Sequence, residues 1–437
     1  MNATLNAPTP WSWGLRTLFR FFFCYWTFWA LPANGRVSVF TAIPGTDTLF
    51  APYTSLWHAI VQWTGGHVFS LSTERLVYKQ TGSGDTIKDW IEVFCYLVFS
   101  IIITVVWSVL DRKRTEYDTL YRWLRTLVRY NLGLTLLAYG GAKIIPLQFQ
   151  EPRFYDLLKP YGQASPMGVL WRFMGSSLAY TVFAGLAEYV SGALLFFRRT
   201  TVLGAMAAAG VMLNVAVLNY CYDVPVKLYS TNLLLMALFL LAPDATRLMD
   251  VLLLNRAVPA VDPGRDRIIP PRFKYSVRAM VALKVIFMLV IFGGSVEGMW
   301  GGYQETYAKR TRPPLYGLYE VETFSRNGVL LPPLLGDAKR WHRVGFERPN
   351  YLQGWHLDES QFSYQIQLNQ LKHSITLKLP DGGIGQLQYS EPTKGKLELE
   401  GMLVGEPVQI RLRAIDASQF LLLNRGFHWV QEFPFNR

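Results

Sequence analysis

The chain of 437 residues is 51% hydrophobic and 15% aromatic, and it carries a formal charge of +12 at pH 7. Its Lys and Arg residues lie in short segments beside long apolar runs and do not gather into one basic stripe, so nucleic acid is excluded as an expected partner. The three cysteines form no Cys-x-x-Cys pair and no two of the six histidines have a ligand spacing, so neither a dithiol redox motif nor a metal site is expected. This composition is typical of spanning helices combined with a soluble part.

Seven long apolar runs predict seven membrane-spanning helices, since a helix crosses the hydrocarbon core with roughly 20 mostly apolar residues. In chain order they cover residues 15–31, 90–110, 124–145, 167–197, 202–220, 228–241 and 277–296. The stretch 33–86 is too polar to span, and its Trp-rich piece 53–71 has the pattern of an amphipathic helix at the membrane interface. Within that stretch, the sequence GSGDT predicts a helix N-cap at Asp85 or Thr86.

The basic residues predict the orientation, because connections rich in Lys and Arg stay on the cytoplasmic side. Residues 112–122 hold four Lys or Arg, residues 198–199 are both Arg, and residues 247–278 hold seven. The opposite connection, residues 33–86, holds only three. These counts predict a cytoplasmic N-terminus and an extracytoplasmic segment after the seventh helix, and they place all six histidines on the outer side.

From residue 303 the apolar and polar residues alternate over short stretches, as they do in half-buried strands. About eight strands at regular spacing predict an antiparallel barrel or sandwich, and about 130 residues suffice to bury a separate core. The clearest strands are predicted at residues 360–370, 373–380, 383–391, 395–404, 406–415 and 419–427.

A polar site is expected where the predicted helices meet the outer face. Opposite charges and amides that converge there would suit a polar head group, a quinone ring or a carboxylate. The alternative is a solvated loop in which Asp223 and Lys227, four residues apart, form an ion pair of little energetic weight. The candidate residues of this site are Lys143, Gln148, Asn214, Asn219, Asp223 and Lys227.

Charged residues inside the apolar runs predict a second feature, because such groups usually face the interior of a helical bundle. Glu188 lies about ten residues, or roughly 15 Å at helical rise, from the cytoplasmic end of the fourth helix. Arg129 enters the third helix from the same side, so the two are predicted to form an intramembrane ion pair if their helices are neighbours. Such a pair would either serve function or only hold the bundle together. Lys284, well inside the seventh helix, needs a partner or a path by which its ammonium group reaches water.

The central part of the chain resembles the DoxX-like membrane proteins. The resemblance covers residues 122–244, and it rests on the order YGGAKIIPLQF, SPMGVLWRFMG, GLAEYVSGALLFFRRTTVLGA and NYCYDVPVKL. The most telling part is a Gly-x-x-Glu helix followed by an Arg-Arg-Thr turn and a helix rich in Gly and Ala. Both ends of the chain also look like those of larger bacterial members with extra spans and a C-terminal β domain.

This resemblance implies a bacterial inner-membrane protein related to thiosulfate:quinone oxidoreductase subunits and oxidative-stress membrane complexes, and distantly to vitamin K-dependent carboxylases. It also implies that Lys143, Glu188, Asp223 and Lys227 line a quinone-like or lipid-like site. No cysteine pair, haem motif or flavin motif accompanies these residues, which argues against an autonomous redox catalyst.

The expected architecture is a helical membrane bundle of about seven transmembrane helices with a four-helix DoxX-like core, followed by an all-β extracytoplasmic domain. The expected domain limits are residues 1–120, with two helices and the loop 33–86, then residues 121–300 and residues 301–437. The leading functional hypothesis is a subunit or accessory of a quinone-linked or redox-stress membrane system, in contact with membrane lipid. Two alternatives stay open: an enzyme that acts on a lipid or isoprenoid with Lys143 or Lys227 as base, and a membrane-anchored module whose β domain binds a protein partner.

Overall fold

The protein consists of two units. A computed structural model describes residues 10–32, 36–43, 45–77, 81–260, 274–309, 311–379 and 382–436. We call Met1–Gln148 together with Ala179–Tyr303 the helical unit, and Phe149–Leu178 together with Gln304–Arg437 the barrel unit. The sequence predicts boundaries near residues 120 and 300, and it does not predict that the segment Phe149–Leu178 belongs with the barrel. The predicted limit at residue 120 separates no unit of its own.

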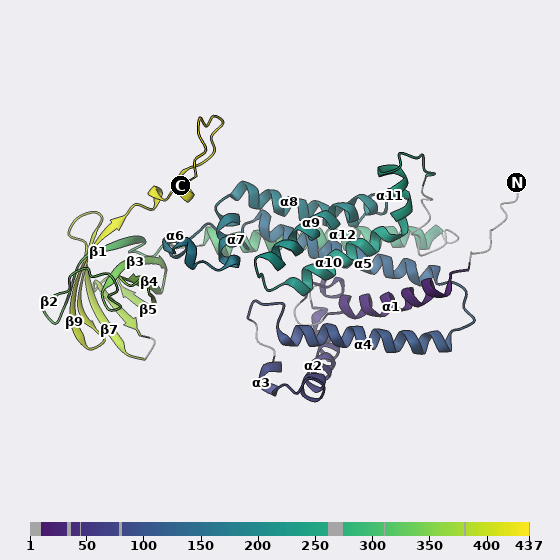
Figure 1. Cartoon of the computed structure of the whole chain (residues 1–437), viewed down its shortest axis with the longest axis horizontal. Helices are drawn as coiled ribbons and strands as arrows, with labels where there is room; N and C mark the ends of the chain where they lie inside the picture. The colour runs from purple at the N-terminus through teal and green to yellow at the C-terminus, as the bar shows by residue number, and fades with distance from the viewer. Residues whose placement is uncertain are drawn as a thin grey trace. The chain divides into compact units, whose positions relative to one another are not determined.

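Seven long helices run side by side in the helical unit (Figure 1). Among the described residues, five of these helices are long and apolar enough to cross a membrane. The other two, α1 and α5, have the predicted positions but are more polar, so seven spans remain a prediction. The five are α4 (Ile87–Leu110), α8 (Leu178–Leu195), α9 (Thr201–Cys221), α10 (Lys227–Leu241) and α12 (Lys274–Tyr303), and the other two are α1 (Trp13–Ala30) and α5 (Asp118–Ile144).

Further helices fill the connection between α1 and α4. The helix predicted at residues 53–71 is confirmed as α2 (Ala51–His67), and the ring of its Trp57 packs 4.6 Å from that of Tyr96 on α4. The same connection holds η1 (Val39–Thr41), η2 (Asp47–Phe50) and α3 (Thr73–Leu76). Further short elements of the described chain are α6 (Phe154–Leu158), η3 (Tyr161–Gln163), η4 (Arg198–Thr200), η5 (Ala242–Asp244), α11 (Ala245–Leu252) and η6 (Gln304–Ala308).

The predicted fourth helix, residues 167–197, is wrong as a single span. It is divided into α7 (Pro166–Gly175) and α8, because the helix ends at Ser176, whose backbone N–H donates to the carbonyls of Arg172 and Met174. Gly175 packs so closely on the backbone of Gln150 that a Cβ atom there would collide with the Gln150 carbonyl oxygen. Only α8 therefore belongs to the bundle.

Four glycines bring α5 and α8 into close contact. A Cβ atom built on Gly140 would lie 2.7 Å from the Gly185 carbonyl oxygen, and one built on Gly133 would lie 3.1 Å from that of Gly192. Small residues at such positions allow membrane helices to approach each other closely. The two contacts also define the register: the end of α5 lies against the beginning of α8, as expected for antiparallel helices.

Two neighbouring residues start two different helices. Thr86 caps α4 in a capping box with Asp89, which confirms the predicted N-cap. The side chain of Asp85 instead accepts hydrogen bonds from the backbone N–H groups of Lys227 and Leu228, at 2.7 and 2.9 Å. Asp85 thus caps α10 from a segment 142 residues away, which ties the connection before α4 to the beginning of α10.

Eight antiparallel strands close into a barrel in the barrel unit, which decides between the predicted barrel and sandwich. Each strand pairs with the next, and β1 pairs with β9 from Leu318 opposite Ile415 to Arg326 opposite Val408. The two-residue strand β2 (Val329–Leu330) only extends β1. The barrel strands are β1 (Gly317–Arg326), β3 (Trp341–Arg348), β4 (Tyr351–His356), β5 (Gln361–Asn369), β6 (Ser374–Lys378), β7 (Ile384–Ser390), β8 (Lys396–Leu403) and β9 (Glu406–Ile415).

Alternation along the strands fills the barrel with apolar side chains, among them Phe324, Trp341 and Leu399. An eight-stranded barrel has an interior just wide enough for such side chains. Five of the six predicted strands are confirmed as β5 to β9. The sixth, residues 419–427, is wrong: η7 (Ala417–Gln419) and the short helix α13 (Leu421–Asn424) follow β9, because the barrel is already closed by the pairing of β9 with β1.

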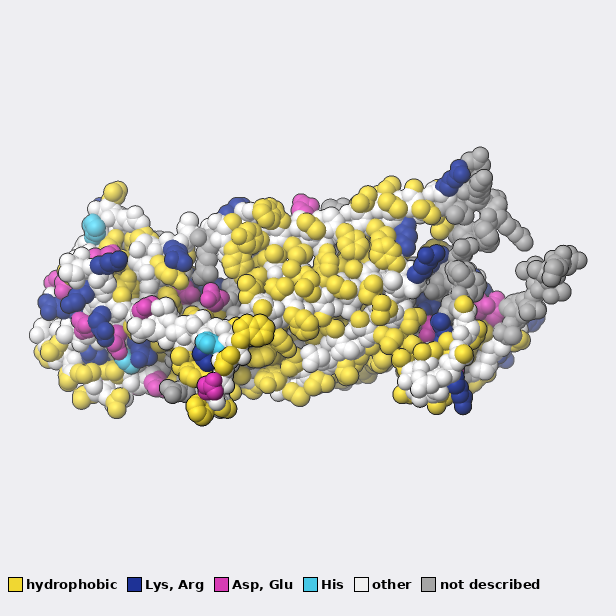
Figure 2. All heavy atoms as spheres, turned by 90° about the horizontal axis from the view of Figure 1, so that it is seen from above, with side chains coloured by type: hydrophobic (Ala, Val, Ile, Leu, Met, Phe, Trp, Pro, Cys, Tyr) yellow, Lys and Arg dark blue, Asp and Glu magenta, His cyan; other side chains and the backbone are white. Residues whose placement is uncertain are grey.

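The surfaces of the two units differ in character. On the face shown in Figure 2, hydrophobic side chains cover most of the helical unit, whereas Lys, Arg, Asp and Glu mix over the barrel unit. Only 6% of the apolar window of α12 and 22% of that of α4 are buried. So much exposed apolar surface on long helices indicates a membrane protein.

Candidate functional site

Glu188 pairs with Lys143 and not with Arg129. The Lys143 ammonium group donates to the Glu188 carboxylate at 2.8 Å, and both side chains are buried. Arg129 instead donates to the Thr201 hydroxyl at 3.2 Å. The predicted Arg129–Glu188 pair is therefore wrong.

The glycine contacts explain this outcome. Gly140 of α5 lies against Gly185 of α8, and a Cβ atom built on Gly185 would lie 2.8 Å from the Cβ atom of Lys143, so Lys143 borders the turn of α8 that leads to Glu188. Arg129 lies 14 residues earlier on α5, roughly 21 Å along the axis. A helix register of this kind is set by side-chain packing, and counting from the ends of two runs does not reveal it.

The other predicted site residues do not converge on one point. Asp223 and Lys227 form an ion pair of 2.8 Å, with Asp85 3.9 Å from the same ammonium group. Asn219 is buried and donates to the Ser230 hydroxyl at 3.0 Å. Asn214 is exposed on the surface of α9.

Gln148 lies just after α5 and ends the first segment of the helical unit. Its side-chain oxygen is buried without a hydrogen-bond partner in the described part of the chain. Of the six residues, Lys143 pairs with Glu188, Asp223 and Lys227 pair with each other, Asn219 donates to Ser230, and the amides of Gln148 and Asn214 lie apart.

A cavity of about 760 Å³ lies at the end of the bundle where α4 and α10 begin and α5 ends. We call it the Arg36 pocket. Its volume falls in the range of small-molecule sites. It is lined by Trp29, Arg36, Glu74, Arg75, Val77, Thr81, Gly82, Ser83, Gly84, Thr86, Lys88, Asp89, Val93, Tyr139, Val226, Leu228 and Tyr229.

Arg36 is the most constrained charged group of this pocket. Its guanidinium group donates to the Glu92 carboxylate at 2.9 Å and to the Tyr96 hydroxyl at 2.6 Å, and Glu92 and Tyr96 are fully buried. Tyr96 also donates to Glu92. Burial alone would lower the pKa of Arg36, but Glu92 and Tyr96 hold it above its ordinary value, so this side chain stays charged.

One N–H group of the Arg36 guanidinium has no hydrogen-bond partner in the described part of the chain. This group, at Nε, is buried. A buried N–H group without a partner is costly, which makes it a strong donor for an incoming acceptor oxygen. The loop that carries Arg36 is held by hydrogen bonds from the Ser38 hydroxyl to the Ala30 carbonyl and from the Val39 N–H to Asn131.

Aromatic rings form the wall beside Arg36. The guanidinium carbon lies 4.6 Å from the centre of the Trp29 ring, which stacks on Tyr229 at 6.0 Å, and Tyr229 lies 5.8 Å from Tyr139. Such a wall suits a flat ring that carries an acceptor oxygen. Thus the pocket offers stacking surfaces beside a donor that is fixed in place.

The charges at the pocket are balanced. Three cations, Arg36, Arg75 and Lys88, line it together with the carboxylates of Glu74 and Asp89, and Glu92 contacts Arg36 as the third carboxylate. With three charges of each sign, this arrangement favours a neutral polar ligand over an anion.

The residues that build this pocket are not among the site residues predicted from the sequence. Glu92 lies inside the predicted second helix, where an ionisable residue is itself a signal of function. Arg36 counts there only as one of three basic loop residues. Arg36 and Glu92 lie 56 positions apart in the chain, and they meet because the loop that carries Arg36 folds back beside α4. No local sequence pattern reveals this contact.

Comparison with known proteins identifies a relative in Bacillus subtilis. Over 126 residues the chain is 32% identical to the uncharacterized protein YwoB of strain 168, and the matched region covers 28% of this chain and 78% of YwoB. No family model and no solved structure matches the chain. With 32% identity over most of the length of YwoB, this chain belongs to the same protein family as YwoB.

Proposed function

We propose that the helical unit binds a quinone head group in the Arg36 pocket, and that the protein serves as a DoxX-like subunit or accessory of a quinone-linked membrane system. The observation that carries this proposal is the buried Arg36 Nε without a partner, next to a wall of aromatic rings. A quinone carbonyl accepts a hydrogen bond from Arg36 while the quinone ring stacks on Trp29 or Tyr229.

The balanced charge of the pocket supports a quinone over an anionic ligand. Glu92 already compensates the charge of Arg36 at 2.9 Å, so a carboxylate ligand would face a neutralised guanidinium group. A quinone is neutral and needs only the donor. Its isoprenoid tail fits beside the apolar side chains of Val93 and Leu228, which belong to two of the membrane-spanning candidates.

The geometry lends less support to an enzyme that uses Lys143 or Lys227 as base. Each ammonium group lies 2.8 Å from a carboxylate, Glu188 or Asp223. The hydrogen bond to Asp223 raises the pKa of Lys227, whereas a general base must release its proton. Binding therefore fits these residues better than proton abstraction does.

Our proposal places the protein in a bacterial inner membrane, with a cytoplasmic N-terminus and the barrel on the outer side. The basic connections support this orientation, although part of one of them, residues 261–273, lies outside the described residues. The Arg36 pocket then opens at the outer end of the bundle.

A protein partner for the barrel unit is a second candidate function. Four apolar side chains after α13 are strongly exposed, namely Phe427, Trp429, Val430 and Phe433, with Trp429 at 90%. Exposed apolar patches of this kind mark interaction sites. Deletion of residues 427–436 from the full chain should abolish recovery of a partner that co-purifies with the wild type, and an unchanged partner would contradict this candidate.

The quinone proposal is tested by extraction. Protein purified in mild detergent should retain quinone in near-stoichiometric amount, measured by liquid chromatography and mass spectrometry. Arg36→Lys keeps a charge opposite Glu92 but loses the guanidinium N–H group, and a hydrogen bond to a charged group contributes about 1.5–3 kcal/mol. We therefore expect about ten- to a hundredfold weaker quinone binding.

The matched control is Arg112→Lys, at an exposed arginine beyond the other end of α4. It should retain quinone as the wild type does. Repeated extraction that finds only phospholipid would refute the proposal, as would equal quinone retention by the Arg36 and Arg112 variants.

A further inference from the structure

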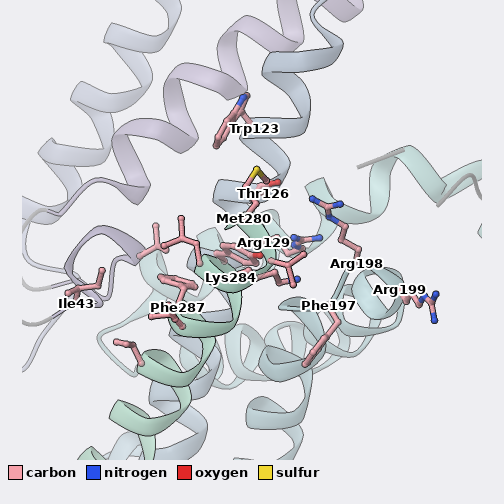
Figure 3. Close-up of a pocket in the computed structure, with 16 residues that line it drawn as sticks. Ile43, Trp123, Thr126, Arg129, Phe197, Arg198, Arg199, Met280, Lys284 and Phe287 are labelled. Atoms are coloured by element: carbon pink, nitrogen blue, oxygen red, sulfur yellow. The ribbon is translucent and has the colours of Figure 1, made fainter. Parts of the chain in front are cut away.

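A second cavity lies at the opposite end of the bundle, between α5, η4 and α12 (Figure 3). We call it the Lys284 groove. It has a volume of about 970 Å³, and most of the side chains along it are apolar. Its lining consists of Val39, Ile43, Trp123, Thr126, Arg129, Tyr130, Phe197, Arg198, Arg199, Met280, Val281, Leu283, Lys284, Ile286, Phe287 and Val290.

Four cations line this groove, and its lining includes no carboxylate. Arg129 comes from α5, Arg198 and Arg199 from η4, and Lys284 from α12, and Figure 3 shows Arg129 and Lys284 close together. Arg129 and Arg198 both repel the Lys284 ammonium group electrostatically. Like charges gathered in this way favour an anion between them.

Lys284 is partly buried, whereas Arg198 and Arg199 are exposed. Within the described residues it forms no hydrogen bond or ion pair, and its ammonium nitrogen lies 5.9 Å from the centre of the Phe197 ring. It lies ten residues after the start of α12, roughly 15 Å along the helix. An ammonium group at that depth needs a counter-charge or a path to water.

Apolar side chains continue the groove away from the cations. Phe287 and Val290 follow Lys284 along α12, and Val39 and Ile43 belong to the loop that folds back into the bundle. The Phe287 ring lies 5.7 Å from that of Tyr130, so this part of the groove has an ordered wall. A ligand that fits must be charged at one end and apolar along the other.

We propose that the Lys284 groove binds an anionic phospholipid, with its phosphate between Lys284, Arg129 and Arg198 and one acyl chain along Phe287 and Val290. Basic pockets between membrane helices bind anionic lipid head groups. Guanidinium groups suit phosphate because they donate two parallel hydrogen bonds. This site lies apart from the Arg36 pocket and takes a charged ligand, whereas that pocket takes a neutral one.

The experiment uses the full chain, freed of lipid in a neutral detergent and analysed by native mass spectrometry. The probes are phosphatidylglycerol, phosphatidylcholine with the same acyl chains, and inorganic phosphate. Each Lys or Arg near an anionic lipid contributes about fivefold in affinity. Lys284→Gln should therefore weaken phosphatidylglycerol binding about fivefold, and Arg198→Gln combined with Lys284→Gln about 25-fold.

Two further variants keep the test independent of folding defects. Lys284→Arg retains the charge and should bind phosphatidylglycerol as the wild type does. Arg278→Gln removes a charge from an exposed residue of the same helix that does not line the groove, and it should also have no effect.

Equal binding of the two lipids by the wild type would overturn the proposal, as would equal losses in Lys284→Gln and Arg278→Gln. Binding of inorganic phosphate that competes with phosphatidylglycerol supports a phosphate site, and loss of the acyl-chain contribution in Phe287→Ala identifies the lipid as its source. Tight inorganic phosphate binding with no gain from an acyl chain would assign the cations to soluble phosphate and overturn the lipid proposal.

Discussion

Replacing Glu188 by Gln tests the buried ion pair of the helical unit. The carboxylate oxygen lies 2.8 Å from the Lys143 ammonium group, and the two side chains are only 4% and 9% exposed. The amide has nearly the same shape but no charge, so Lys143 is left buried beside a neutral group. Removing one partner of a buried pair costs about 3–5 kcal/mol, because the remaining charge is uncompensated.

The assay compares the free energy of unfolding of four proteins in the same lipid nanodiscs: wild type, Glu188→Gln, Lys143→Met, and the double variant that combines these two substitutions. Each single variant should lose about 3–5 kcal/mol, whereas the double variant should approach the wild type because it leaves no buried charge. A double-mutant cycle then gives the coupling energy of the pair.

The chain provides a matched control in Asp223→Asn. The Asp223–Lys227 ion pair has the same 2.8 Å length, but the Asp223 side chain is 83% exposed. Exposed pairs contribute about 0–1 kcal/mol, so this change should have little effect. Our reasoning would be refuted if Glu188→Gln stayed within about 0.5 kcal/mol of the wild type, or if both carboxylate changes had equal cost.

Three further predictions concern the helix contacts and the barrel. Gly140→Leu should prevent normal assembly of the helical unit, because its Cβ atom would lie 2.6 Å from a backbone nitrogen of α8. Gly210→Leu should be tolerated, since no atom lies within 4 Å of its Cβ position. Resistance of the two variants to proteolysis in nanodiscs would check both expectations. Asp85→Ala should cost about 1 kcal/mol through loss of the α10 cap, and an unfolding midpoint equal to that of the wild type would count against the cap. Burial lowers the pKa of His342 and His356 below 6.5 in the folded barrel. The unfolded chain therefore binds more protons, and the barrel should lose stability as the pH falls below 6.5. This loss of stability should shrink when both histidines are replaced by Gln, and an unfolding midpoint that does not change between pH 8 and 5 would contradict the prediction.

Local patterns were sufficient to predict most elements. The long helices appear where apolar runs predict them, and five barrel strands appear where apolar and polar residues alternate, because both periodicities reflect which side chains are buried. The N-cap at Thr86 follows from the same local chemistry. The run 167–197 misled because hydrophobicity alone does not mark the helix end at Ser176.

Long-range contacts decided the candidate sites. The Arg36 pocket depends on a loop that folds back against Glu92, and the partner of Glu188 depends on which glycines of α5 and α8 meet. Glu92 and Glu188 are charged residues inside apolar runs, which indicates that each needs a partner. Which residue becomes the partner depends on the tertiary packing around each carboxylate.

The sequence by itself determined that the chain has spanning-type helices, a separate β domain and charges inside the bundle, because burial leaves a periodic trace in the residues of each element. Only the tertiary structure decided that Lys143 compensates Glu188, that Asp85 caps α10, and that β1 closes the barrel against β9. Those contacts join residues far apart in the chain, and the energy of each depends on packing geometry that no single segment encodes.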